Sequence, residues 1–338
     1  MSVNKNMNVK KSIKKKGIKK SKTVRKNVKK ISLQSAAEAI VMQNMNIQFL
    51  EKVLVVTDTK MMKFGKAIYD AARKVNIDTN LLVTPAPSAN GSEPDDVVAA
   101  AMKTSDVVIA VTSRSISHTK ARREACKAGT RIASMPGVSE LSFTQGGLTA
   151  DYSKVSELTN RMYEAMKGRR KVKVESKNGT NVSFEIGDMI LDRDMGLIRA
   201  RGQFGNLPAG EVDTAPNEGT AKGVIVFDEL TGYGKNIMLE VGNGIVEKTD
   251  CKRLEELFSS MPKARNIAEF GIGTNPHAKI IGNTLEDEKV LGSVHIALGN
   301  NMTYGGHCDV QFHKDGIIEE PTVEVDGRLV IRSGKWLV

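Results

Sequence analysis

Four side chains of types that bind metal ions lie between residues 295 and 315, namely His295, His307, His313 and Asp315. The chain has only five histidines, so three of them in this window indicate a site. His313 and Asp315 are two residues apart in a strand-like segment, where side chains i and i+2 share one face. Two imidazoles and one carboxylate suit zinc, manganese, cobalt or non-haem iron, with coordination positions left open for chemistry.

An ordinary surface position explains the same histidines without a metal ion. Histidines in glycine-rich, polar segments are often solvated loop residues, so both interpretations stand at this point. His307 is the weakest of the three, because it follows Gly305 and Gly306 and a turn accounts for it.

Two glutamates stand out by their context. Glu211 lies in the Gly/Pro-rich segment NLPAGEVDTAP, and Glu269 lies in the apolar run NIAEFGIG, where an unpaired carboxylate is costly to bury. Each is explained either by chemistry or by a structural role, such as a helix cap, a salt bridge or plain exposure.

The motifs GEVDTAP, AEFGIGTNP, EDEKVLGSVHIALG and FHKDG occur in this order, and together they resemble the M29 metallo-aminopeptidases of the aminopeptidase T kind. The resemblance covers the chain from about Ala36 onward. It implies a centre of two divalent ions, Zn, Co or Mn, about 3.5–4 Å apart. Carried over motif by motif, its ligands are Glu211, Glu269, His295, His313 and Asp315.

The resemblance also implies a function. A metal-activated water would hydrolyse the N-terminal residue from a peptide, with Glu211 as the base, in a cytoplasmic homodimer. The chain departs from the larger members of the family where they carry a tyrosine, since Met302 stands at that position. Tyr304, two residues on, is the candidate replacement as a catalytic group.

Two other functions stay open. The same superfamily includes enzymes similar to 2,5-dihydroxypyridine dioxygenase, in which His295, His313 and Asp315 would hold one Fe(II) ion. The presence of both Glu211 and Glu269 favours two metals and hydrolysis over this alternative. A noncatalytic, nucleic-acid-binding protein is the third possibility, but aromatic residues make up only 4% of the chain and offer no stacking platform.

The elements that must position these residues form two domains. Residues 36–168 alternate strand patterns with amphipathic helix patterns, which predicts a Rossmann-like parallel α/β domain, although the G-x-G-x-x-G signature of a dinucleotide site is missing. Residues 169–338 carry Asn178-Gly179, Asn243-Gly244 and Asp326-Gly327 between alternating runs, which predicts an antiparallel β metal-binding domain. The strands expected in the first domain are 52–58, 80–84 and 106–112, and the helices are 63–75, 95–104, 118–129 and 152–167.

The net charge of +11 is concentrated at one end of the chain. Residues 1–30 hold twelve Lys, one Arg and no acid, which leaves −2 for the remainder. We predict a disordered basic tail over residues 1–35, with weak nonspecific nucleic-acid contact as one possible role. The three separated cysteines are typical of a reduced cytoplasm, and the apolar runs are too short for a transmembrane helix, so we expect no membrane partner.

Overall fold

The computed structural model describes residues 30–338. Most of the predicted basic tail, residues 1–29, therefore lies outside the described residues. The first helix, α1, begins at Leu33, with the Ser32 side chain as its N-cap. Within the described part of the chain, none of the helices combines the length and the apolar character needed to cross a membrane.

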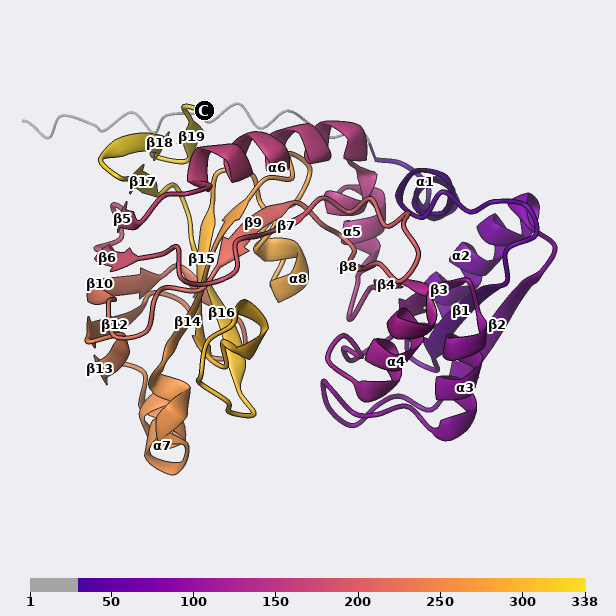
Figure 1. Ribbon diagram of the computed structural model, residues 1–338, viewed down its shortest axis with the longest axis horizontal. Coiled ribbons are helices and arrows are strands. Elements are labelled where there is room, and N and C mark those ends of the chain that lie inside the picture. Colours follow the sequence, from indigo (N-terminus) through magenta and orange to yellow (C-terminus); the bar gives the residue numbers. More distant parts are fainter. Residues whose placement is uncertain (1–29) are drawn as a thin grey trace, which may run out of the picture.

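The first half of the chain, together with one strand from beyond residue 200, folds around a parallel five-stranded sheet, which confirms the predicted Rossmann-like α/β architecture (Figure 1). In spatial order its strands are β2 (Thr79–Thr84), β1 (Val53–Asp58), β3 (Val107–Val111), β4 (Arg131–Ser134) and β8 (Phe204–Asn206). The helical elements of this half are α1 (Leu33–Ala39), η1 (Ile40–Asn44), α2 (Met62–Val75), α3 (Asp96–Thr104), α4 (Lys120–Ala128), α5 (Glu140–Thr144), η2 (Gly147–Thr149) and α6 (Tyr152–Met166).

Alternate residues of the parallel strands enter two separate cores. Val55 and Ile109 pack with Ile68 of α2, whereas Val56 and Val108 pack in the cluster that contains Met102 of α3. Both faces of the sheet are therefore covered by helices, which explains why its central strands β1 and β3 are buried along their whole length and mainly apolar.

The second half contains two antiparallel sheets, where the sequence predicted one β-rich domain. The eight-stranded sheet has the order β13 (Ile245–Thr249), β12 (Ile237–Gly242), β10 (Lys222–Phe227), β6 (Asn181–Glu185), β5 (Lys171–Glu175), β17 (Thr322–Val325), β18 (Arg328–Arg332), β19 (Lys335–Trp336). The six-stranded sheet has the order β11 (Glu229–Leu230), β16 (His313–Ile318), β15 (Val294–Gly299), β14 (Ile267–Gly273), β9 (Glu211–Thr214), β7 (Asp192–Asp194). The helical elements here are α7 (Lys252–Ser260), η3 (Pro262–Arg265), α8 (Thr284–Asp287) and η4 (Met302–Tyr304).

The hairpin predictions hold at the level of strand pairing. Asn243 and Asp326, each followed by glycine, have positive φ and connect β12 to β13 and β17 to β18. Asn178-Gly179 lies in a longer loop between β5 and β6, and only the glycine has positive φ.

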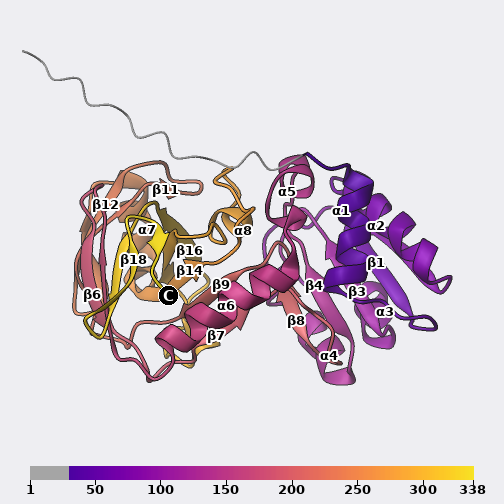
Figure 2. The ribbon, with the colours of Figure 1, turned by 90° about the horizontal axis from the view of Figure 1, so that it is seen from above.

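One face of the six-stranded sheet is apolar and packs against the eight-stranded sheet. Phe270 of β14 meets Phe184 of β6 edge to face, with ring centroids 5.1 Å apart. The other face lies toward α8 and the first half of the chain, as the two views of the ribbon show (Figure 1 and Figure 2). The alternation of strand side chains therefore separates a core face from a face available for chemistry.

Candidate metal centre

Strand register collects the candidate residues on one face of the six-stranded sheet. Residues directly opposite each other in an antiparallel pair point to the same side. His295 pairs with Gly271, which pairs with Asp213, and Asp315 pairs with Ala297, which pairs with Glu269. We call this surface the site face, and its ionisable residues are Asp192, Asp194, Glu211, Asp213, Glu229, Glu269, His295, His313 and Asp315.

Glu269 lies between the two histidines. Its Oε1 is 3.0 Å from Nε2 of His295, and its Oε2 is 2.9 Å from Nε2 of His313. Burial raises the pKa of Glu269, but the hydrogen bonds from the two imidazoles outweigh it and hold the pKa well below its usual range. Burial lowers the pKa of His295, yet Glu269 and Glu211 raise it to about 10. This carboxylate and both imidazoles are thus directed at the same small volume.

The orientation of His313 suits a metal ligand. Its Nδ1 lies 2.8 Å from the backbone carbonyl oxygen of Asn300, and a carbonyl can only accept, so Nδ1 carries the proton. Its Nε2 donates to Oε2 of Glu269 and lies 3.5 Å from Oδ1 of Asp315. Burial lowers the pKa of His313, but Asp315 and Glu269 raise it well above its usual range, so a metal ion bound here would replace the proton on Nε2. Ligand histidines are commonly oriented by such a bond from the other ring nitrogen.

The fully buried ring of His295 rests on Gly271. A Cβ at position 271 would overlap the Cε1 and Nε2 atoms of this ring. The glycine in the AEFGIG motif therefore has a specific purpose, since no larger residue leaves room for the imidazole at this place.

Glu211 has a buried partner that the sequence analysis missed. Its Oε1 accepts a hydrogen bond from Nζ of Lys289, which also lies 2.7 Å from Oε1 of Glu288. Lys289 is 1% exposed; burial lowers its pKa, but the two carboxylates raise it well above its usual range, so it stays charged. The signal was present in the motif EDEKVLGSV, where a lysine follows three acids directly before an apolar strand.

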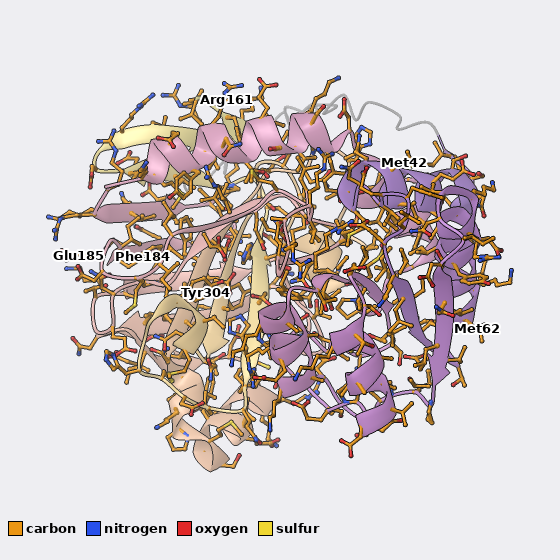
Figure 3. The ribbon with its side chains drawn as sticks, turned by 45° about the vertical axis from the view of Figure 1, so that its right-hand side comes forward. Met42, Met62, Arg161, Phe184, Glu185 and Tyr304 are labelled. Carbon is orange, nitrogen blue, oxygen red and sulfur yellow. The ribbon has the colours of Figure 1, made fainter. Side chains whose placement is uncertain are left out.

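Tyr304 reaches the site face but is already hydrogen-bonded. It lies in η4, where Figure 3 labels it. Its hydroxyl donates to Oδ2 of Asp213 at 2.7 Å. Burial, followed by the charge of Glu269, raises the pKa of Asp213 to about 7. Asp213 was also missed, although it stands two residues after Glu211 in a strand and the i, i+2 argument used for His313 and Asp315 applies to it equally.

Two other histidines, His307 and His118, lie off the site face. The His307 side chain is 87% exposed and its Nδ1 is 3.4 Å from Glu218, which matches the solvated turn. His118 lies at the surface and directly precedes Thr119, the N-cap of α4. Desolvation and then the positive charge of His313 lower the pKa of His118, so this residue of the first domain interacts electrostatically with the site face.

The donor set fits a divalent metal ion. Ligand atoms of Glu269, His295 and Asp315 all lie within 4.8 Å of one another, and among residues 30–338 no other group of this kind occurs. Two buried polar atoms beside it, Oε2 of Glu211 and Nδ1 of His295, have no hydrogen-bond partner in the described structure. Buried charges of this kind are normally paired or bound to a metal, so a cation at this point accounts for the cluster.

Comparison with known proteins gives the family. A family model described as "NicX: 2,5-dihydroxypyridine 5,6-dioxygenase" matches residues 32–338. The chain belongs to this family. A curated 2,5-dihydroxypyridine 5,6-dioxygenase from Pseudomonas putida KT2440 is 22% identical over 191 residues, which are 50% of this chain and 55% of that protein. The alignment thus spans about half the length of this relative.

Two solved structures share the fold. The 2,5-dihydroxypyridine dioxygenase of P. putida KT2440 matches with a TM-score of 0.76 and 20% sequence identity. The match covers 91% of this chain and 98% of the dioxygenase chain. Wild-type AmpT from Thermus thermophilus has a TM-score of 0.69 at 17% identity and covers 90% of this chain and 99% of its own. The predicted relation to aminopeptidase T therefore holds for the fold, while the family model is that of the alternative considered above. The family model is named for an enzyme, which supports an enzyme without fixing its class.

Proposed function

We propose that this chain is a single-metal dioxygenase that opens a hydroxylated, nitrogen-containing aromatic ring. The observation that carries the proposal is that two histidines and an aspartate surround the Glu269 carboxylate. Ligand atoms of Glu269, His295 and Asp315 lie within 4.8 Å of one another, and Nε2 of His313 is 3.5 Å from Oδ1 of Asp315. Two histidines and one carboxylate form the ligand set typical of non-haem Fe(II) oxygenases. Membership of the dioxygenase family over residues 32–338 supports the same assignment.

The side chains around this point have separable tasks. A bound Fe(II) ion would supply the redox chemistry by which O2 reacts with a ring. Asn300 orients His313 through its carbonyl group, and Gly271 leaves room for the ring of His295. Burial and then the charge of Asp213 raise the pKa of Tyr304 well above its usual range, so this hydroxyl remains a hydrogen-bond donor.

His118 would contact the substrate from the first domain. Its lowered pKa keeps the imidazole neutral at pH 7, so it can accept a proton from a ring hydroxyl group. The substrate class follows from the family description, and the ring of a hydroxypyridine has the two features that such a site can use: a hydroxyl group to deprotonate and an electron-rich ring to oxidise.

Metal-dependent aminopeptidase activity is the second candidate, and one observation favours it. Glu211 and Glu269 both lie on the site face with His295, His313 and Asp315, so the whole ligand set implied by the M29 resemblance is assembled. In this function two ions would activate a water for attack on an N-terminal peptide bond, with Tyr304 close by.

The two candidates are separated by metal content and by substrate. The protein would be purified without chelators, loaded anaerobically with Fe(II), and assayed for O2 uptake with 2,5-dihydroxypyridine. In parallel, protein loaded with Mn, Co or Zn would be given aminoacyl anilides. One Fe per chain with substrate-dependent O2 uptake is the expected result. Anilide hydrolysis with two ions per chain and no O2 uptake would contradict the proposal and establish the second candidate.

A further inference from the structure

We infer that Lys289 supplies the positive charge that a second metal ion would otherwise supply at Glu211, and thereby limits the centre to one metal ion. The inference rests on the proposed metal centre but not on the reaction proposed for it. In this inference Lys289 positions the Glu211 carboxylate and prevents a second metal ion from binding there.

The lysine occupies Oε1 of Glu211, one of the two carboxylate oxygens through which Glu211 could hold a metal ion. In two-metal centres the ions lie about 3.5–4 Å apart and are held by shared ligands. Oε2 of Glu211 lies 3.6 Å from Nε2 of His295, on the side of the ligand cluster. Oε1 of Glu211 accepts from the Lys289 ammonium, which also pairs with Glu288. A divalent ion at Oε1 would have to displace a buried cation.

The backbone around Lys289 holds it in this position. Its carbonyl oxygen accepts from the Asn275 amide at 2.9 Å, and its own amide donates to the Glu286 carbonyl at 3.2 Å. Gly273, the register partner of Glu211, lies against the backbone carbonyl groups of Lys289 and Val290, which any Cβ at position 273 would overlap. The lysine is therefore a built part of the site face and not a surface side chain that happens to turn inward.

Charge balance gives the reason for a fixed ammonium. Glu211 and Glu288 are both buried, and two buried carboxylates require a cation between them. Without Lys289 the same two carboxylates become an additional oxygen-rich cation site next to the first one. Divalent ions with hard-ligand preference, such as Mn²⁺, suit such oxygens.

The test measures bound metal in metal-free protein dialysed against MnCl2, with elemental analysis as the readout. The variants are Lys289→Met, which removes the charge, and Lys289→Arg, which keeps it. Lys248→Met is the matched control, because it removes another Lys–Glu pair, at 3.1 Å from Glu240, on the exposed strand β13. We expect one Mn²⁺ per chain in wild type, Lys289→Arg and Lys248→Met, and two in Lys289→Met.

Thermal unfolding covers the case in which Lys289→Met is unstable. For Lys289→Met we expect the melting temperature to rise over two separate ranges of MnCl2 concentration. Wild type and Lys248→Met should show only the first rise. Two ions in the wild type, one ion in Lys289→Met, or a Lys289→Met protein that Mn²⁺ does not stabilise would each overturn the inference. One ion per chain without O2 uptake would sink the proposed reaction alone and leave the role of Lys289 standing.

Discussion

The two ends of the site face neutralise buried carboxylates in different ways. At one end Glu269 is flanked by two imidazoles, and an imidazole nitrogen can also bind a metal ion. At the other end Glu211 is bonded to a lysine, whose charge is permanent and whose nitrogen has no free lone pair. Two glutamates that look alike in the sequence thus differ in chemistry, because the partner of a carboxylate decides whether it is free to bind metal.

The largest effect is expected at the imidazole end. His313→Ala or Asp315→Ala removes a proposed ligand, so most bound metal and activity should be lost. Loss of a hydrogen-bond partner of a ligand already costs about 10- to 100-fold, and loss of a ligand should exceed this. Elemental analysis and O2 uptake measure the change, and circular dichroism checks the fold. Full metal content and turnover in both variants would refute the assignment.

A smaller effect is expected from the support beneath His295. Gly271→Ala places a Cβ inside the volume of the imidazole, so the ring must move. Overpacking of this kind costs about 1–3 kcal/mol of stability, and metal affinity should fall with it. Urea unfolding and a metal titration measure both quantities. Ala268→Gly, in the same strand, is the control: it should bind metal as wild type does. Unchanged metal affinity in Gly271→Ala would show that His295 is not a ligand.

A third buried glutamate, Glu286, extends the comparison, because it has no salt-bridge partner among residues 30–338. Glu286 accepts from the backbone amides of Gly147 and Lys279, and burial raises its pKa to about 7. A raised carboxyl pKa means that the folded state binds the proton more tightly than the unfolded state. The free energy of unfolding should therefore fall as the pH rises from about 4.5 to 7, by about 3 kcal/mol at most.

Glu286→Gln is the variant that isolates this contribution. It keeps an acceptor oxygen and cannot ionise, so its stability relative to wild type should increase between pH 4.5 and 7 and stay constant above. Urea unfolding at several pH values gives the difference. A difference independent of pH over this range would mean that Glu286 titrates normally.

The smallest effect is expected for the histidine outside the site face. His307→Ala removes an exposed side chain, so stability should change by no more than about 0.5 kcal/mol and metal content should not change. Metal analysis of this variant beside His313→Ala compares two histidines from one short window. Loss of metal in His307→Ala would mean that His307 is itself a metal ligand and would contradict the distinction drawn between His307 and His313.

The sequence predicts this fold well where the pattern is local. The βα alternation, the helix over 152–167 and the Asn-Gly and Asp-Gly turns depend on neighbouring residues, and each has its counterpart in the structure. The division of the second half into two sheets depends on pairing between distant strands, such as β5 with β17, which no local pattern contains.

The sequence predicted only part of the site, again because local patterns can be read from the sequence and pairing between distant strands cannot. Spacing placed His313 and Asp315 on one face, and the motifs supplied the other three residues. Lys289 and Asp213 were missed because their roles depend on which strand lies beside them. The peptide substrate, the homodimer and the cytoplasmic location remain predictions.

Strand β8 has a consequence for how this protein can be divided. It lies beyond residue 200, yet it pairs with β4 and forms the edge of the parallel sheet (Figure 1). A fragment that ends at residue 168 would leave the hydrogen-bonding groups of β4 open, and an open strand edge invites association with other chains. The two halves of this enzyme are therefore interleaved along the gene, and neither can be exchanged for a homologous half by a single crossover without breaking a sheet.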